Sequence, residues 1–315
     1  MDTLRESIAS FLELSPPSVV SDGRILNSIE EDGFRRDLVQ YSSRDGDEIQ
    51  AFLFVPNGPV RGAVLALHQH NSQWEIGKSE VAGLMGDPLQ AFGPTLARQG
   101  ITVLAPDSVG FESRMKTVSG GNSLAPKLER PYSTAEGWLQ YYNQMAHRLV
   151  VGDLLIRKVL QDCADALSVL RTRSDFPRLG VIGHSFGGIA ALFLAALDTR
   201  VEFACASGAV CSLRQKLASG TGLEMSLVIP GFLQRFDTDD VLRCVAPRRI
   251  FVVSSDNDPQ TEDANDVVAN ARSAFQQRHC EHHLLHLRVP GSHALDRQRT
   301  DAMVEWMLAE ASLPE

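Results

Sequence analysis

Short apolar runs alternate with amphipathic segments along most of the chain. The runs are apolar at successive positions, which is typical of strands buried on both faces of a parallel sheet. The segments between them carry apolar residues at a spacing of three to four, which favours helices. We predict strands over 62–67, 101–105, 179–182, 201–207, 249–253 and 284–289, and helices over 88–99, 148–172, 189–197, 262–278 and 296–311. This alternation predicts an α/β fold with a doubly wound, mostly parallel sheet.

The pattern differs near the N-terminus and in two internal stretches. Residues 3–14 have an amphipathic helical period, and two strands are predicted within 34–55. We therefore predict an N-terminal helical extension over 1–33 and one α/β domain over 34–315. Two irregular insertions, at about 108–147 and 210–245, are expected to lie above the sheet.

Composition limits the class of protein and its partners. Of the 315 residues, 43% are hydrophobic, which is enough for a large core. The net charge of −9 includes no basic run, so we expect no nucleic-acid partner. Five cysteines without C-x-x-C spacing favour reduced, buried thiols. The N-terminus lacks an apolar signal region, and the longest apolar run, 189–197, is too short to cross a bilayer. We expect a cytoplasmic protein that could form a homo-oligomer and has no membrane partner.

A candidate nucleophile stands between the strand 179–182 and the helix 189–197. The segment Gly183-His184-Ser185-Phe186-Gly187 fits the pattern G-x-S-x-G. Glycines at these positions let a strand turn sharply into a helix and lift the serine hydroxyl above the sheet. We interpret Ser185 as the nucleophile of a serine hydrolase; the alternative is an ordinary glycine-rich turn.

A serine hydroxyl needs a base, and the base needs a group that orients it. In this kind of fold the chain order is serine, acid, histidine. His293 follows the last predicted strand and is the predicted base. The acid should follow the strand 249–253, where Asp256 and Asp258 both qualify by position. The remaining downstream histidines are expected to be solvated or packed, and their spacing matches no metal site: His279, His282, His283 and His286.

Backbone N–H groups should stabilise the oxyanion that forms when a serine attacks a carbonyl. One is expected from Phe186, directly after the nucleophile, and another from the loop after the strand 62–67. That loop reads Leu67-His68-Gln69-His70-Asn71. Its place at the carboxyl end of a buried strand puts it at the predicted site.

These motifs recur in the order found in a known group of enzymes. The chain resembles the dienelactone-hydrolase-like and acetyl-xylan-esterase-like branch of the α/β-hydrolase superfamily over roughly 60–312. The resemblance is carried by Leu67-His68-Gln69-His70, Gly77-Lys78-Ser79-Glu80, Leu104-Ala105-Pro106-Asp107, Gly110-Phe111-Glu112-Ser113-Arg114, Gly183-His184-Ser185-Phe186-Gly187-Gly188, Ala246-Pro247-Arg248 and Gly291-Ser292-His293.

The resemblance implies roles for further residues. Counting from Ala246-Pro247-Arg248, it places the acid at Asp258, with Ser255 where relatives have a glycine. It leaves Gln69 or His70 as the second oxyanion donor and favours His70. Dienelactone hydrolases proper use a cysteine nucleophile, whereas this chain has Ser185, so the resemblance points to the esterases. Asp107, Glu112 and Arg114 resemble a motif of structural ion pairs that holds the loop above the site.

The function expected from these residues is carboxylesterase activity on a small or medium ester, through Ser185, His293 and Asp258. This chemistry requires neither a metal nor an organic cofactor. The same triad could instead cleave a lactone, an amide or a carbon–carbon bond, and a non-catalytic binding protein is the alternative from another class. Aromatic residues in the two insertions suggest a pocket for an apolar or ring-bearing group, and the alternative is that they pack as a core between the two insertions.

Overall fold

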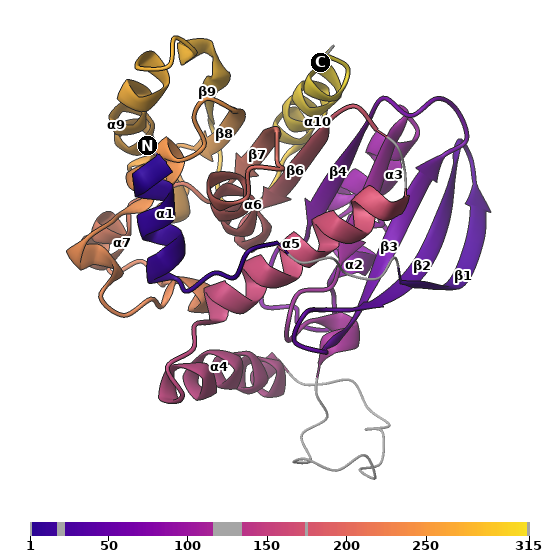
Figure 1. Ribbon diagram of the computed structural model, residues 1–315, viewed down its shortest axis with the longest axis horizontal. Helices are drawn as coiled ribbons and strands as arrows, with labels where there is room; N and C mark the ends of the chain where they lie inside the picture. The colour runs from indigo at the N-terminus through magenta and orange to yellow at the C-terminus, as the bar shows by residue number, and fades with distance from the viewer. Residues whose placement is uncertain (1, 18–22, 116–133, 174–175, 314–315) are drawn as a thin grey trace.

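A single mixed sheet organises the chain in the computed structural model, which describes residues 2–17, 23–115, 134–173 and 176–313 (Figure 1). Within these ranges the sheet has nine strands in the order β1-β2-β3-β5-β4-β6-β7-β8-β9. The strands are β1 Arg24–Glu31, β2 Phe34–Ser42, β3 Glu48–Pro56, β4 Gly62–Leu67, β5 Ile101–Pro106, β6 Leu179–His184, β7 Phe203–Ser207, β8 Arg249–Ser255 and β9 Leu284–Val289. The strands β1, β2, β3 and β5 pair antiparallel, and β5, β4, β6, β7, β8 and β9 pair parallel. The predicted mostly parallel α/β sheet is confirmed.

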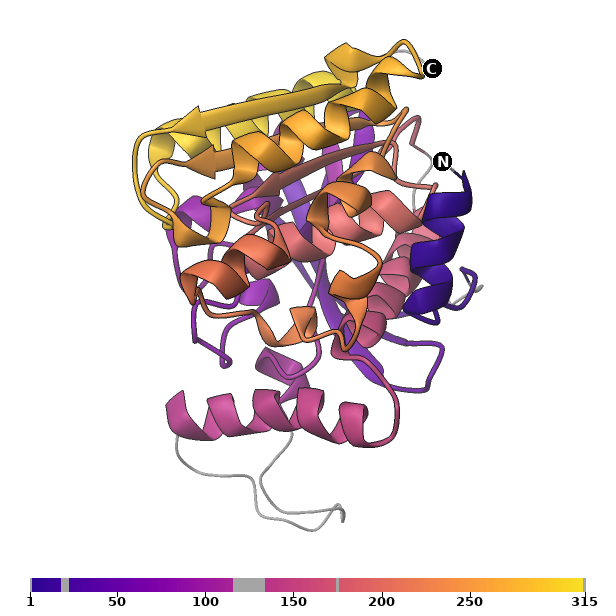
Figure 2. The same cartoon turned by 90° about the vertical axis from the view of Figure 1, so that its left-hand side faces the viewer.

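Helices cover both faces of this sheet (Figures 1 and 2). The α-helices are α1 Asp2–Phe11, α2 Lys78–Val81, α3 Phe92–Ala97, α4 Thr134–Val150, α5 Leu155–Arg173, α6 Phe186–Leu197, α7 Leu213–Ser219, α8 Thr238–Arg243, α9 Ala264–Gln276 and α10 Arg297–Ala311. Strand β4 is apolar throughout because its side chains pack into a core on each face of the sheet. Ala63 and Leu65 pack into the core beneath α5 and α6, whereas Val64 and Ala66 pack into the core beneath α3 and α10.

The segment expected to be a helical extension contains a strand as well as a helix. Helix α1 is present and buries Ile8 against the main core. Strand β1, however, lies within the predicted extension 1–33 and forms the edge of the sheet. Its side chains are almost all exposed, including Ile25 and Ile29, so the strand lacks the apolar alternation that would predict it.

The two predicted insertions are more helical than the sequence indicated. Helix α4 begins within 108–147 and ends at Val150, and residues 116–133 of this insertion fall outside the described ranges. The helix predicted over 148–172 begins at Leu155, because the chain turns at Gly152 with a φ of +77°. The second insertion contains α7 and α8.

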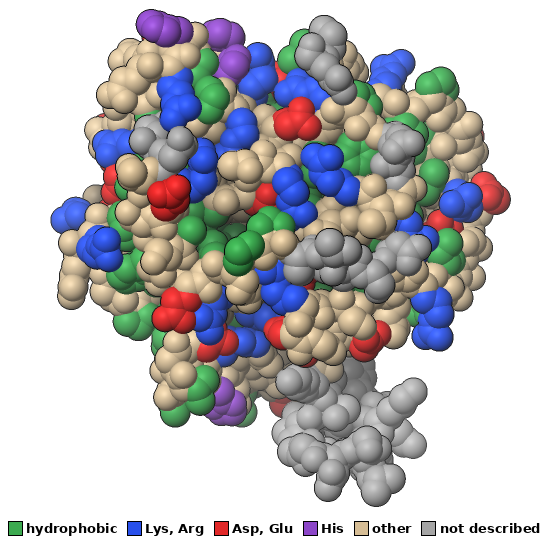
Figure 3. Space-filling view, in the orientation of Figure 1, with side chains coloured by type: hydrophobic (Ala, Val, Ile, Leu, Met, Phe, Trp, Pro, Cys, Tyr) green, Lys and Arg blue, Asp and Glu red, His purple; other side chains and the backbone are tan. Residues whose placement is uncertain are grey.

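The distribution of surface charges and the burial of the cysteines agree with what the composition predicts. Acidic and basic side chains are intermingled with apolar ones on the face seen in Figure 3. All five cysteines are free and buried, as predicted. Among the described residues, no helix has both the length and the apolar character needed to cross a membrane.

Candidate active site

Ser185 lies at the turn between β6 and α6, in a strained backbone conformation. Its φ of 56° and ψ of −123° are unusual for a residue with a side chain. The Ser185 backbone N–H donates to Ser207 O at 2.8 Å, which ties the turn to the end of the neighbouring strand β7. The hydroxyl is thereby presented at the carboxyl edge of the sheet.

The glycines around Ser185 are required by close backbone contacts. A Cβ atom on Gly187 would lie 2.2 Å from Leu67 O, and one on Gly183 would lie 2.2 Å from the carbonyl carbon of Gly187. A Cβ on Gly188 would lie 2.5 Å from Ser207 O. Only glycine therefore lets β6 turn into α6 directly against the ends of β4 and β7.

His293 connects Ser185 to an acid. Its Nε2 lies 2.8 Å from Ser185 Oγ, and its Nδ1 lies 3.0 Å from each carboxylate oxygen of Asp258. Because a carboxylate only accepts, Nδ1 carries a proton that it donates to Asp258. In the neutral ring Nε2 is then free to accept the proton of the Ser185 hydroxyl. This arrangement can generate a serine nucleophile.

The two candidate acids differ in burial and in partner. The Asp258 side chain is fully buried, and its Oδ1 also accepts from Gln260 N at 2.9 Å. Burial alone would raise the pKa of Asp258, but the hydrogen bond and charge of His293, the Gln260 N–H and the charge of Arg299 together lower it. The Asp256 side chain is 56% exposed and pairs with Arg288 at 3.1 Å. The structure thus brings Asp258, and not Asp256, to His293.

The loop that carries His293 is held by hydrogen bonds to its backbone carbonyls. Arg299, at the start of α10, is completely buried and donates to His293 O and Ser292 O, each at 3.0 Å. Ser255 Oγ donates to the same Ser292 carbonyl at 2.8 Å. Ser255, the last residue of β8, thus links the strand before Asp258 to the loop of the base.

The His184 ring packs against the His293 ring. The two ring centroids are 5.0 Å apart, and His184 Nδ1 lies 3.0 Å from Ser207 Oγ. Burial, followed by the charges of His293 and Arg299, holds the pKa of His184 well below its usual value. His184 is therefore a neutral packing partner of the base.

Two backbone N–H groups are available next to Ser185. Phe186 begins α6, and His70 lies in the loop after β4; both residues line the same pocket as Ser185. Within the described part of the chain, neither of these N–H groups donates to another protein group. The Gln69 side chain is turned away, because its Nε2 donates to Glu80 Oε1 at 2.8 Å. His70, which lines the pocket with Ser185, stays the predicted second donor.

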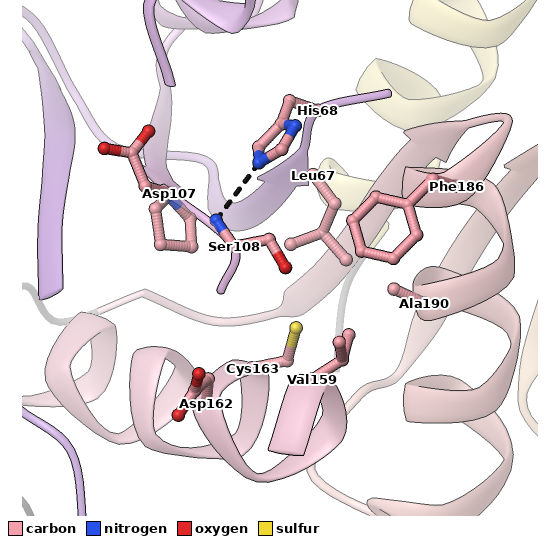
Figure 4. Close-up of a pocket in the computed structure, with 10 residues that line it drawn as sticks. Leu67, His68, Asp107, Ser108, Val159, Asp162, Cys163, Phe186 and Ala190 are labelled. Atoms are coloured by element: carbon pink, nitrogen blue, oxygen red, sulfur yellow. Dashed lines mark hydrogen bonds between the residues drawn. The ribbon is translucent and has the colours of Figure 1, made fainter. Parts of the chain in front are cut away.

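His68 fixes this loop from within the protein. Its Nε2 accepts from the Ser108 N–H at 3.1 Å, so the proton lies on Nδ1, which donates to Gln69 O at 2.8 Å. Figure 4 shows the first of these bonds beside a small pocket of about 20 Å³, which Phe186 also lines. The neutral His68 ring thereby connects the β4 and β5 loops.

A buried ion cluster supports the same region. Lys78 Nζ lies 2.8 Å from Asp107 and 2.5 Å from Glu112. Arg114 instead pairs with Asp162 at 2.7 Å and with Asp47 at 3.0 Å. The motif residues Asp107, Glu112 and Arg114 therefore make structural ion pairs. None of these three residues lines the pocket at Ser185.

A pocket of about 370 Å³ opens above Ser185 at the carboxyl ends of the parallel strands. Its lining comes from α4, from the start of α6 and from the loops at the carboxyl ends of the parallel strands. The residues are His70, Asn71, Ser72, Trp138, Ser185, Phe186, Ile189, Gly208, Gly222, Leu223, Glu224, Met225, Gln260 and His293. Within the described ranges, no group of three or more His, Cys, Asp or Glu residues could hold a metal ion.

Comparison with known proteins supports this architecture. The chain is 29% identical over 217 residues to YtaP of Bacillus subtilis, which is described as a candidate hydrolase. That match covers 65% of this chain and 64% of YtaP, which is less than two thirds of the relative's length. No protein-family profile matches the chain.

Comparison with solved structures identifies the fold of the chain. A Bacteroides fragilis protein described as a candidate acetyl xylan esterase aligns with a TM-score of 0.71 at 16% identity, covering 91% of this chain and 74% of its own. A glucuronoyl esterase from Solibacter usitatus aligns with a TM-score of 0.65 at 14% identity, covering 98% and 92%. The chain has the α/β-hydrolase fold.

Several residues of this α/β-hydrolase site were not predicted from sequence. Arg299 and Ser207 orient the base and the elbow, and Lys216, Glu224 and Gln260 lie in or behind the pocket wall. Of these residues, only Gln260 could have been expected near the site from the sequence, because it stands two residues after the predicted acid. The others are polar residues whose burial depends on tertiary contacts.

The contact at Gly187 can be tested by stability. In Gly187→Ala the new methyl group would collide with Leu67 O, so we expect a loss of unfolding free energy of at least about 2 kcal/mol. Gly58→Ala is the matched control, since nothing lies within 4 Å of its Cβ position. Urea unfolding measures both. Equal stability of the two variants would contradict the required close approach.

Acid should weaken the loop that carries His70. Burial, with a contribution from His68, lowers the pKa of His70 to about 4, and its neutral Nδ1 accepts from the Ser72 N–H. Between about pH 6.5 and pH 4 the unfolded chain binds a proton that the folded chain does not, so stability falls as pH falls. The His70 contribution is at most about 3 kcal/mol.

His70→Asn keeps an acceptor for Ser72 but has no proton to bind in this range. We expect its unfolding free energy, measured in urea from pH 7 to pH 4, to depend less on pH than that of the wild type. Some dependence should remain because His184 also has a lowered pKa. An unchanged pH dependence would exclude His70 as a source of acid sensitivity.

Proposed function

We propose that the protein is a serine carboxylic-ester hydrolase that acts on small or medium esters. The observation that carries this proposal is the continuous hydrogen-bond chain from Ser185 through His293 to Asp258 at the base of an open pocket. Resemblance to esterases in fold is consistent with it. The cytoplasm is the proposed location, because the five free thiols suit a reducing compartment.

In the proposed first half-reaction, Ser185 Oγ attacks the ester carbonyl while His293 Nε2 takes the hydroxyl proton. Asp258 holds the imidazole in the required tautomer and stabilises its charged form. The N–H groups of Phe186 and His70 donate to the tetrahedral oxyanion. His293 then returns the proton to the leaving alcohol, which leaves an acyl group on Ser185.

In the second half-reaction, water replaces the alcohol. His293 removes a proton from the water as it attacks the acyl-enzyme carbonyl, and the same N–H groups stabilise the second oxyanion. Return of the proton to Ser185 Oγ releases the carboxylic acid. The two half-reactions use the same residues, and water is the second reactant.

Substitution of the two aspartates distinguishes the proposed acid from its neighbour. Asp258→Asn should lower kcat for p-nitrophenyl butyrate by about 10⁴-fold, since the amide favours the wrong imidazole tautomer. Asp256→Asn should change kcat only a few-fold, because Asp256 faces solvent and pairs with Arg288. Steady-state hydrolysis measures both. The opposite order of losses would show that Asp256 is the orienting acid.

Ser185→Ala tests the nucleophile. It should lower kcat by at least about 10³-fold while the thermal unfolding temperature stays within a few degrees of the wild type, because the hydroxyl is not needed for packing. Wild-type activity retained by a folded Ser185→Ala protein would contradict the proposal. Absence of wild-type turnover across p-nitrophenyl esters of graded chain length would favour a binding protein.

A further inference from the structure

One corner of the catalytic pocket is lined by polar groups. Gly222 and Glu224 reach it from the segment after α7, and Gln260 reaches it from the turn after Asp258. Gln260 Nε2 lies 3.5 Å from Gly222 O, so the two segments meet there. Lys216 of α7 lies directly behind Gln260. We call Lys216, Gly222, Glu224 and Gln260 the polar corner.

Lys216 determines which end of the Gln260 amide faces the pocket. The Lys216 residue is 1% exposed, and its Nζ donates to Gln260 Oε1. An ammonium group only donates, so the atom that it contacts must be the amide oxygen. The NH₂ group of Gln260 is then the free end. Its contact with Gly222 O at 3.5 Å is long for a hydrogen bond and uses one of its two protons.

Glu224 contributes an acceptor to the same corner. Its Oε1 accepts from the Tyr141 hydroxyl at 2.6 Å, and its Oε2 accepts from the N–H of Ser226 at 2.6 Å and from the Ser226 hydroxyl. In the described part of the chain no Lys or Arg forms an ion pair with Glu224. A carboxylate offers about four acceptor directions, so one remains after these three bonds.

A donor beside an acceptor fits one kind of ligand group. A hydroxyl can donate to Glu224 and accept from Gln260 Nε2 at the same time. A carboxylate would further disfavour the charged form of Glu224, whose pKa burial already raises. An ammonium group would leave the Gln260 donor unsatisfied and would face the positive charge of Lys216. The two groups together therefore select for a neutral hydroxyl.

We infer that the polar corner binds a hydroxyl group of the substrate, so that the enzyme prefers esters carrying a free hydroxyl to plain alkyl esters. The inference rests on the proposed function, because it concerns the same pocket. A plain alkyl ester would displace water from Glu224 and Gln260 without replacing the hydrogen bonds, which is costly in a buried site. Sites built to bind a hydroxyl discriminate strongly against analogues that lack it.

Two pairs of substrates test this selectivity on either side of the ester bond. For the acyl side, p-nitrophenyl 3-hydroxybutyrate is compared with p-nitrophenyl butyrate. For the alcohol side, glyceryl monobutyrate is compared with propyl butyrate. We expect kcat/KM to favour the hydroxylated ester by about 10-fold or more in at least one pair. The ratio within one preparation does not depend on the fraction of active enzyme.

Variants then locate the selectivity. Gln260→Glu keeps the size and an acceptor for Lys216 but removes the donor, and Lys216→Met removes the charge that orients the amide. Both should reduce the wild-type preference by about 10-fold. Arg214→Met is the matched control: it removes a cation from the same helix, but Arg214 is exposed, and the preference should be retained.

The outcomes separate this inference from the proposed function. Hydrolysis of the esters without a preference for either hydroxylated substrate would overturn the polar corner and leave the esterase intact. A preference that survives both Gln260→Glu and Lys216→Met would also overturn it. If none of the four esters is hydrolysed and Ser185 does not react with a fluorophosphonate, the proposed function itself fails.

Discussion

The backbone of the elbow packs against the end of β4 so closely that no side chain fits between them. The Cβ position of Gly187 lies 2.2 Å from the Leu67 carbonyl oxygen, at the point where the chain enters the His68–Asn71 loop. This contact brings the first N–H of α6 beside that loop, and it places Ser185 in its strained conformation above the sheet. The nucleophile and both proposed oxyanion donors therefore depend on the same glycine contacts.

The base reaches Ser185 from a loop without regular secondary structure, so it must be held by specific bonds. Arg299 and Ser255 both donate to the carbonyl of Ser292, and Arg299 also donates to that of His293. A fully buried guanidinium is costly unless its donors are paired, and these carbonyls pair with both terminal nitrogens, Nη1 and Nη2. Residues 108 positions apart in the chain thus come within hydrogen-bond distance.

Much of the fold was predictable because the central strands are buried on both faces and are apolar at every position. Strand β1 was not, since it lies at the edge of the sheet and exposes both of its faces. The start of α5 was misplaced because the helical pattern of α4 runs into it across Gly152. For β1 the missing information was its place at the edge of the sheet, and for α5 it was the turn at Gly152.

In the candidate site, too, some residues were predictable from the sequence and others were not. Ser185 and His293 stand in local motifs, whereas Asp256 and Asp258 follow the same strand and differ only in burial and partner. The polar corner was not predictable, because Lys216, Glu224 and Gln260 are separated in sequence and such residues are usually solvated. Their burial beside the pocket arises only when the loops after β7 and β8 meet.

The most direct test of the account is to map the site of covalent labelling by a fluorophosphonate. The account predicts one adduct, found on Ser185 by peptide mass spectrometry, whose rate of formation falls by orders of magnitude in His293→Ala, because the hydroxyl then lacks its proton acceptor. An adduct on another serine, or labelling of Ser185 that is equally fast without His293, would contradict the central claim.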